Sequence, residues 1–400
     1  MNASTSPELA ERRQLAARAM RRRLVAHVAA GGSTDLADAP LEQDAASYCD
    51  PGTAAREVAE IFLKRPLIAC LSQDLPAAGD RVVCDALGRS VLIVRQHSGE
   101  LRAYRNMCLH RGAKLVRPAV QGRCESARFI TCPFHAWTYD LDGKLRAVPG
   151  SEGFAGLDLA SRRLLPVPVA ECNGIVFVRL AGGAAPIDCA ATLGEFASVL
   201  ELLELASFMP VQASVLEART NWKYAIDTYG EGYHFGVLHS STIGETHFSN
   251  VAAFDAFGPH WRLQFAERGL AALVGRPESL WPEPEYGGIH FVFPNAVLVV
   301  GAPAPGEGFV RMFRIFPGAT PGEMTCRFSV YARGVAPEAF RTRYGGIDDS
   351  ASEVTLEDYR VAVEAFANLA SAPAGFRVVF GRNEPALQAF HRAVAAAIGA

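Results

Sequence analysis

Hydrophobic and polar positions divide the chain into stretches with different spacing of the apolar residues. Residues 1–50 begin with an Ala- and Arg-rich helical pattern and continue into a connection rich in Gly, Ser and Asp. From residue 51 to 182 the apolar positions fall in short runs separated by Gly and Asp, which is typical of strands joined by hairpins. Clear examples of such runs are residues 67–72, 90–95 and 175–180. We therefore predict an N-terminal helical extension over 1–50 and a small all-β domain over 51–182.

The pattern changes after a boundary rich in Gly and Ala at residues 181–186. From there amphipathic helical stretches alternate with longer strand-like runs. Residues 183–400 are therefore predicted to form a second domain of the α+β class, a mostly antiparallel sheet with helices on one side. The expected helices cover 193–205, a stretch from 222, 354–369 and 384–398, and the expected strands lie near 260–265, 289–293, 296–300, 310–316 and 324–332.

Composition narrows the class of protein. The chain has 400 residues and a net charge of −3, enough for two domains with apolar cores and no reason to expect nucleic-acid binding. No apolar run reaches the length of a membrane span, and no hydrophobic signal peptide opens the chain, so we expect a cytoplasmic protein. The nine cysteines are odd in number and scattered, which argues for a reducing compartment rather than a disulfide framework. Those outside the motif below are interpreted as buried small residues or inert thiols.

Two short motifs in the all-β domain combine cysteine with histidine. The first places His110 two residues after Cys108, and the second places His135 three residues after Cys132. Thiolate and imidazole together suit zinc, or an iron–sulfur cluster in which His replaces Cys on one iron. Zinc fingers place their two Cys together and their two His together, whereas each loop here carries one of each. A cluster with one Cys-ligated and one His-ligated iron needs that mixed arrangement.

This segment resembles the Rieske [2Fe-2S] motif of the Rieske non-haem iron oxygenases. The resemblance implies that Cys108 and Cys132 bind one iron and that His110 and His135 bind the other. The gap of 21 residues between His110 and Cys132 is longer than in many family members. We expect the additional residues to form a hairpin extension around 121–127.

A second histidine pair occurs in the α+β domain, where His234 and His239 are five residues apart. At about 100° per residue, positions i and i+5 on an ideal helix diverge by about 140°. The two rings can therefore bind one ion only if the helix ends or widens between them, and Gly236 permits either. With one carboxylate they would complete the facial triad of non-haem Fe(II).

The stretch around these histidines is similar to the mononuclear-iron motif of the Rieske oxygenases. The resemblance implies that His234 and His239 bind iron. It also implies that Glu231 is an acidic bridge between this iron site and the Rieske ligand His135 of a neighbouring subunit. Many members have Asp at this position, and Glu occurs in some oxygenases that act on quaternary amines.

The third iron ligand is expected in the C-terminal part of the chain. A capping box over 350–353 predicts the start of a helix, and the family places the ligand in a Glu-Asp segment leading into such a helix. We interpret Asp358 as this ligand. Acidic residues in the first turns of a helix also complement the helix dipole without binding metal. The rival candidates are Glu357, Asp349 and Asp348.

Together these motifs resemble the catalytic α subunit of the aromatic-ring-hydroxylating dioxygenase family. The resemblance implies a Rieske domain followed by a helix-grip catalytic domain, with one Rieske [2Fe-2S] cluster and one mononuclear Fe(II). It implies a terminal oxygenase component that uses O2 and electrons from an NAD(P)H-dependent reductase for the mono- or dihydroxylation of an organic substrate, which is expected to be aromatic. We find no nucleotide-binding loop and no plant-type ferredoxin spacing, so a separate reductase is expected, with or without a ferredoxin.

The resemblance also implies a head-to-tail assembly, because the acidic bridge acts between subunits. A homotrimer is expected, or an α3β3 assembly with a small subunit. The sequence leaves three alternatives open. One is oxidative N- or O-demethylation of a methylated amine or ether, the second is a Rieske electron-transfer protein without oxygenase activity, and the third is a zinc-stabilised binding module. His247 and His260 could line the pocket or the core.

Overall fold

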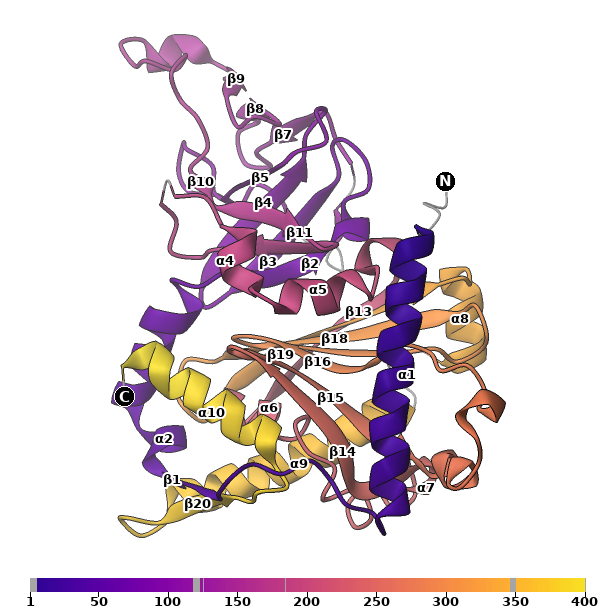
Figure 1. Cartoon of the computed structure of the whole chain (residues 1–400). Helices are drawn as coiled ribbons and strands as arrows, with labels where there is room; N and C mark the ends of the chain where they lie inside the picture. Colours follow the sequence, from indigo (N-terminus) through magenta and orange to yellow (C-terminus); the bar gives the residue numbers. More distant parts are fainter. Residues whose placement is uncertain (1–5, 118–122, 125, 184, 346–349, 400) are drawn as a thin grey trace. The chain divides into compact units, whose positions relative to one another are not determined.

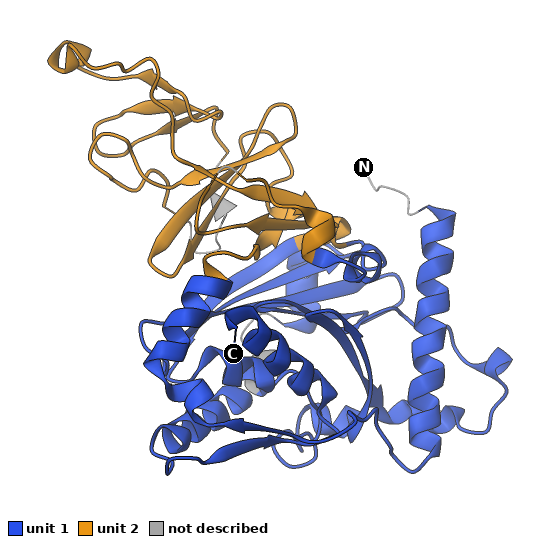
Figure 2. Cartoon of the chain, turned by 60° about the vertical axis from the view of Figure 1, so that its left-hand side comes forward, with its two compact units in different colours: residues 1–61, 193–204, 210–400 blue, residues 62–192, 205–209 orange. Residues whose placement is uncertain are grey.

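The computed structural model describes residues 6–117, 123–124, 126–183, 185–345 and 350–399. The chain divides into two compact units (Figure 2). Unit 1 comprises Met1–Ile61, Leu193–Glu204 and Pro210–Ala400, and unit 2 comprises Phe62–Thr192 and Leu205–Met209. The N-terminal segment therefore packs with the C-terminal half of the chain.

Unit 2 is built from small antiparallel sheets with strand orders β10-β5-β4-β3-β6, β11-β12-β2 and β7-β8-β9. Leu87 and Gly88 join β3 to β4 with φ angles of 52° and 68°, the left-handed pair that a tight two-residue hairpin turn needs. Residues 121, 122 and 125 of the hairpin extension predicted at 121–127 lie outside the described residues, and β6, which falls within this segment, pairs with β3. The strands are β2 (Leu67–Leu71), β3 (Arg81–Ala86), β4 (Arg89–Arg95), β5 (Leu101–Arg105), β6 (Arg123–Cys124), β7 (Phe129–Thr131), β8 (Thr138–Asp140), β9 (Leu145–Ala147), β10 (Pro166–Val167), β11 (Val169–Cys172) and β12 (Ile175–Val178).

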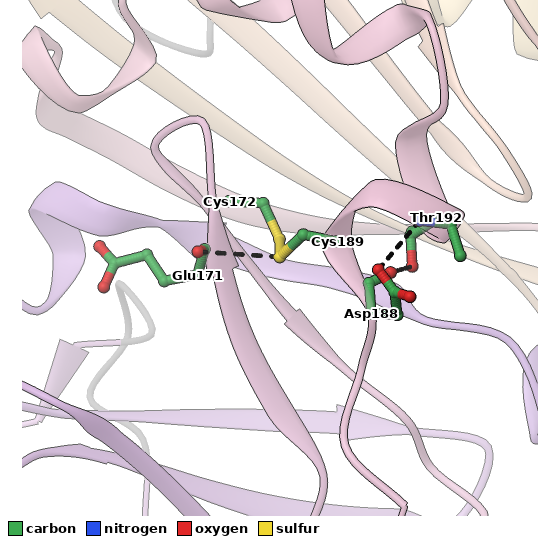
Figure 3. Close-up of a disulfide and its surroundings, with 6 residues drawn as sticks. Glu171, Cys172, Asp188, Cys189 and Thr192 are labelled. Atoms are coloured by element: carbon green, nitrogen blue, oxygen red, sulfur yellow. Dashed lines mark hydrogen bonds between the residues drawn. A yellow bond between two sulfur atoms is a disulfide. The ribbon is translucent and has the colours of Figure 1, made fainter.

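A disulfide joins Cys172, at the end of β11, to Cys189, the first residue of α4 (Cys189–Leu193) (Figure 3). The expectation that every cysteine outside the cluster motif is an unpaired thiol is therefore wrong for this pair. The Cα atoms lie 6.0 Å apart, a separation suited to a disulfide, although the two cysteines are 17 positions apart in the sequence. Folding of the chain between them, and not their spacing, brings them together.

Unit 1 contains a seven-stranded sheet with the order β13-β19-β18-β17-β16-β15-β14. The pairs from β19 to β14 are antiparallel, so the predicted α+β class with an antiparallel sheet is confirmed. A separate pair of strands, β1 and β20, joins the N-terminal segment to the C-terminal region. The strands are β1 (Leu41–Asp44), β13 (Met209–Ala218), β14 (His247–Phe257), β15 (His260–Glu267), β16 (Gly288–Val292), β17 (Ala296–Gly301), β18 (Gly308–Pro317), β19 (Met324–Arg333) and β20 (Arg377–Phe380).

Helices pack against this sheet, with α1 along β14 and β15, α6 on β18, and α10 on β14 and β15 (Figure 1). Aromatic rings fill one end of the interface, where Phe390 of α10 contacts Trp222 of α6 and Phe291 of β16, and Trp261 of β15 stacks on Phe291. The helices are α1 (Pro7–Ala29), α2 (Ala46–Cys49), α3 (Pro51–Glu57), α5 (Phe196–Glu201), α6 (Trp222–Asp227), α7 (Ile243–Thr246), α8 (Pro337–Tyr344), α9 (Ser350–Ala370) and α10 (Pro385–Ile398).

Among the described residues, none of the helices combines the length and apolar character that crossing a bilayer needs.

Candidate metal centres

Two loops of unit 2 carry the Cys/His motifs and share one backbone pattern. The first follows β5, and the second joins β7 to β8. The Gly112 amide donates to the Cys108 carbonyl at 2.9 Å, and the Ala136 amide donates to the Cys132 carbonyl at 3.0 Å. Both closing residues have left-handed backbone, with φ of 73° at Gly112 and 55° at Ala136. Each loop therefore folds back four residues after its cysteine, which directs the cysteine and histidine of that loop to one side.

The four side chains of these loops come together. The thiols of Cys108 and Cys132 contact each other, and both residues are only 2% exposed. The rings of His110 and His135 are half-buried, with centroids 4.7 Å apart. Within the described residues, the buried Nδ1 of His110 has no hydrogen-bond partner. A pair of inner thiols and a pair of outer imidazoles, one with an unsatisfied nitrogen, fits a cluster with one Cys-ligated and one His-ligated iron.

Neighbouring side chains fix the cysteines and histidines of this group. Trp137 stacks on His110 at 4.9 Å with an interplanar angle of 6°. The Tyr139 hydroxyl lies 3.3 Å from the Cys108 sulfur and accepts the Leu109 amide at 3.1 Å. Hydrogen bonds to cysteine sulfur tune the reduction potential of an iron–sulfur cluster, and Tyr139 would have this role in a cluster bound through Cys108.

Helix α6 presents the segment that carries the second histidine pair. Asn221 caps its N-terminus by accepting the Lys223 amide. The helix ends at Asp227, so both His234 and His239 lie in the turns that follow it. The expectation that the helix ends or widens between the two histidines is therefore wrong, because the helix ends before the first of them and the angle between i and i+5 on a helix does not apply.

Both histidines direct Nε2 to the same carboxylate. Asp358 Oδ1 lies 2.9 Å from His239 Nε2 and 3.5 Å from His234 Nε2. One ligand atom from each of the three residues lies within 4.8 Å of the others. Among the rival carboxylates, Glu357 instead lies 2.7 Å from Nδ1 of His239, on the outer side of that ring. Asp348 and Asp349 lie outside the described residues.

The outer nitrogen of each ring also meets a carboxylate. Glu231 accepts from His234 Nδ1 and from the backbone amides of Tyr233 and His234. Burial lowers the pKa of His234, but the Asp358 and Glu231 carboxylates outweigh this effect and raise the pKa to about 9. The buried Nε2 of His234 makes no hydrogen bond within the described residues. Three carboxylates around two imidazoles attract a cation, and this donor set fits a mononuclear iron.

A cavity of about 840 Å3 opens on this group, between the sheet and the segments that carry the histidines. Its aromatic lining consists of Tyr229, Phe235, Phe265, Phe309 and Phe313, together with Tyr286 and His247. Apolar side chains from β15, β16 and β17 complete the sheet side. A volume of this size admits a small organic molecule.

Comparison with known proteins places both units in one family. Residues 65–163 match the family described as the Rieske [2Fe-2S] domain, and residues 205–400 match the ring-hydroxylating α subunit, catalytic domain. The chain belongs to the Rieske non-haem iron oxygenases. The oxygenase therefore has a Rieske cluster and a mononuclear iron as cofactors, and the predicted family, enzyme class and cofactors are confirmed.

Individual relatives of the oxygenase act on different compounds. The carnitine monooxygenase oxygenase subunit of Acinetobacter pittii (strain PHEA-2) is 28% identical over 282 residues, which cover 68% of this chain and 70% of that protein. The anthranilate 1,2-dioxygenase large subunit of Acinetobacter baylyi (strain ATCC 33305 / BD413 / ADP1) is 34% identical over 212 residues, 49% of this chain and 42% of that protein. The solved structure of the quaternary ammonium Rieske monooxygenase CntA with L-carnitine has a TM-score of 0.73 at 20% identity, covering 91% of this chain and 96% of that one. The oxygenase thus shares the fold of a terminal component that works with a reductase in an oligomer.

The remaining histidines of the oxygenase have separate environments. His247 lines the cavity. His260 accepts the Phe293 amide at 3.0 Å and stacks on Phe196 at 5.3 Å, so it belongs to the packed interior. Sequence reasoning did not single out Glu357 as a partner of a ring nitrogen, nor Arg311 as a cavity residue. The signal for Arg311 was present, because F-V-R-M-F at 309–313 places one Arg among apolar residues on one face of a strand.

Proposed function

We propose that the ligands of the two cofactors are the residues of the two motifs. Cys108 and Cys132 hold one iron of the Rieske cluster, and His110 and His135 hold the other. The contact between the two thiols and the unsatisfied His110 Nδ1 support this assignment.

The mononuclear iron is held by His234, His239 and Asp358 in the same proposal. The observation that carries it is the convergence of both Nε2 atoms on one Asp358 oxygen, with the three ligand atoms within 4.8 Å. His239 and Asp358 are almost fully buried, so the site is shielded from water except through the cavity. Two imidazoles and one carboxylate leave positions on iron open for other molecules.

The cofactors divide the chemistry, since the cluster supplies electrons one at a time and the mononuclear iron supplies the place where O2 is activated. Glu231 links the two by holding His234 Nδ1 while reaching toward His135 of the partner subunit. Its side chain is 13% exposed, and Tyr233 and Val237 beside it are 65% and 87% exposed. Exposed apolar side chains next to a buried carboxylate support a subunit contact here.

This electron route requires an oligomer, and we propose a homotrimer or an α3β3 assembly. A separate NAD(P)H-dependent reductase, directly or through a ferredoxin, delivers the electrons.

For the substrate, we favour monooxygenation of an N-methylated or quaternary ammonium compound. The carnitine monooxygenase subunit that covers 68% of this chain supports this class. The Glu at position 231 agrees with it, as does the cavity lining, because aromatic faces such as those of Tyr229 and Phe313 attract quaternary ammonium groups.

A second candidate is hydroxylation of an aromatic ring. It is supported by the likeness to the anthranilate dioxygenase large subunit and by the same aromatic lining, which suits a planar ring. In both candidates the protein is the terminal oxygenase component, and the cavity determines which carbon meets the iron.

Metal analysis with matched histidine variants tests the proposal. The purified protein should be red-brown and should contain sulfide together with more iron than the cluster alone accounts for, whereas a zinc protein would be colourless. His234→Ala should remove the mononuclear iron and abolish product formation but keep the visible cluster spectrum. His97→Ala, an exposed histidine of unit 2, serves as the control and should keep both metals. Loss of the cluster spectrum in His234→Ala would contradict two independent sites.

A further inference from the structure

Arg311 introduces a positive charge into an otherwise apolar face of the cavity. Side chains alternate along β18, so Phe309, Arg311 and Phe313 all line the cavity. Across the sheet, Arg311 pairs with Val299 of β17, which pairs in turn with Ile289 of β16. The guanidinium thus stands in a row of branched aliphatic side chains.

No protein group neutralises this guanidinium within the described part of the chain. Its contact there is with the ring of Phe309, 4.9 Å from the guanidinium carbon to the ring centroid. Burial lowers the pKa of Arg311, with no carboxylate acting in the opposite direction. The other cavity-lining arginine, Arg21, differs because it donates to the Pro282 carbonyl.

None of the acidic residues that line the cavity forms an ion pair with Arg311 in the described part of the chain. Asp358 and Glu231 face the two histidines, and Glu283 is bound by Arg18 and Gln14. The other three, Glu245, Glu267 and Glu285, make no contact with the guanidinium there. An arginine in an apolar wall is costly unless an anion joins it, and its planar fork matches a carboxylate. The missing partner is therefore expected to come from the ligand.

We propose that Arg311 binds the carboxylate of the substrate, so that the oxygenase acts on an organic acid. This inference rests on the proposed function, because it takes the cavity beside the iron as the substrate pocket. Both candidate substrate classes include such acids: a betaine carries a carboxylate beside its ammonium group, and anthranilate carries one on its ring. A neutral hydrocarbon or a free amine alcohol does not fit.

The position of Arg311 also orients the molecule. Phe313 lies two residues further along β18, about 7 Å away, and its ring contacts Tyr229 at 4.9 Å. The Tyr229 hydroxyl is 3.0 Å from that of Tyr359, the residue after Asp358. A ligand held by Arg311 therefore lies along Phe313 and Tyr229 and points its far end toward the iron ligands.

Binding of matched compounds to the anaerobic holoenzyme tests this proposal. The probes are three pairs that differ in the carboxylate: glycine betaine with choline, anthranilate with 2-aminobenzamide, and benzoate with benzamide. Affinity is measured by calorimetry for the wild type, Arg311→Met, Arg311→Lys and the control Arg314→Met. Arg314 lies on the opposite face of β18 and donates to Ser329 at 2.9 Å, so its loss removes an arginine from the same strand outside the cavity.

We expect the wild type to bind the acid of at least one pair and to prefer it over the neutral partner. Arg311→Met should lower the affinity for that acid roughly 10- to 100-fold. Arg311→Lys should lower the affinity less, and Arg314→Met should leave it unchanged. The pair whose acid binds shows whether the substrate is a betaine or an aromatic acid. Equal binding of acid and neutral partner, unchanged binding in Arg311→Met, or no binding of any acid would overturn the inference. Product formation is measured separately with reductase and O2, so a failure of oxygenase activity is distinguished from a failure of carboxylate binding.

Discussion

Two carboxylates hold the outer nitrogens of the proposed iron histidines, and replacing each by its amide separates their roles. Glu231 contacts Nδ1 of His234, and Glu357 lies 2.7 Å from Nδ1 of His239. Glu231→Gln and Glu357→Gln each remove one negative charge while keeping the shape of the side chain and an oxygen that accepts from the ring. The pair is matched, because the two side chains are 13% and 21% exposed.

Loss of a carboxylate behind a metal-bound histidine lowers metal affinity about 10- to 100-fold, which corresponds to about 1.4 to 2.7 kcal/mol. Because burial is similar at the two positions, we expect comparable losses of iron affinity in both variants. Both should regain full loading when Fe(II) is supplied in excess, and both should keep the cluster spectrum. At this level the two substitutions are equivalent.

The two variants should differ in the rate of electron transfer if Glu231, and not Glu357, faces the partner subunit. With iron saturated, Glu357→Gln should recover most of the wild-type turnover, whereas Glu231→Gln should remain on the order of 100-fold slower. The assay follows reoxidation of the chemically reduced cluster by its absorbance, in parallel with product formation. If Glu231→Gln at saturating Fe(II) turns over as fast as Glu357→Gln, Glu231 only orients its histidine and the bridging role is refuted.

Other predictions concern stability and the cluster. Lys223 and Glu57 form a buried ion pair, with the side chains 2% and 1% exposed. Lys223→Met should therefore lower the free energy of unfolding, measured in urea, by about 3–5 kcal/mol, and the double variant Glu57→Gln/Lys223→Met should recover most of this loss. A loss below about 1 kcal/mol in the single variant would contradict the prediction. Burial lowers the pKa of His290 to about 3, below its unfolded value of about 6.5, so the neutral ring's contribution is complete above pH 6.5 and is lost as pH falls toward 3. His290→Phe should therefore reduce the loss of stability between pH 6.5 and 4.5 by about 2 kcal/mol, and an unchanged loss over this range would disprove the prediction. Tyr139→Phe removes the hydroxyl near the Cys108 sulfur and should lower the cluster potential by on the order of 40 mV in redox titration, whereas an unchanged potential would exclude this tuning role.

The ligand candidates could be predicted because they lie in compact motifs with restrictive spacing. The structure brings His234, His239 and Asp358 together as that reasoning anticipated, although the assignment itself remains a proposal. Asp358 was preferred to Glu357 on the family resemblance alone, because the residue pattern itself does not distinguish the two carboxylates. Adjacent residues on a helix point about 100° apart, so only the rotation of α9 relative to the histidines decides which carboxylate meets both Nε2 atoms. That rotation depends on packing far from the motif.

Element types were predictable where the apolar period was clear, as for the strands expected at 289–293 and 296–300, which correspond to β16 and β17. Helix length was less well predicted, because the helix expected from residue 222 was carried as far as the histidines, whereas α6 ends at Asp227, shortly before Gly230 and Gly232. The disulfide between Cys172 and Cys189 was missed for a related reason. Its formation depends on how β11 and α4 lie in the folded unit, and the spacing of the two cysteines carries no information about that.

The cavity itself follows from a difference between two adjacent rows of the sheet. In one row Trp261 and Phe291 present large rings, Val297 and Phe313 follow across the sheet, and the helix residue Phe390 closes over Phe291. In the next row the facing residues are aliphatic, Leu263, Ile289 and Val299, which are too short to fill the same depth. Side chains are therefore smaller in the second row than in the first, and the space that they leave unfilled is the cavity beside Asp358, His234 and His239. Because every strand has a period of two, a one-residue shift in register would place the aromatic row on the other face and close this pocket.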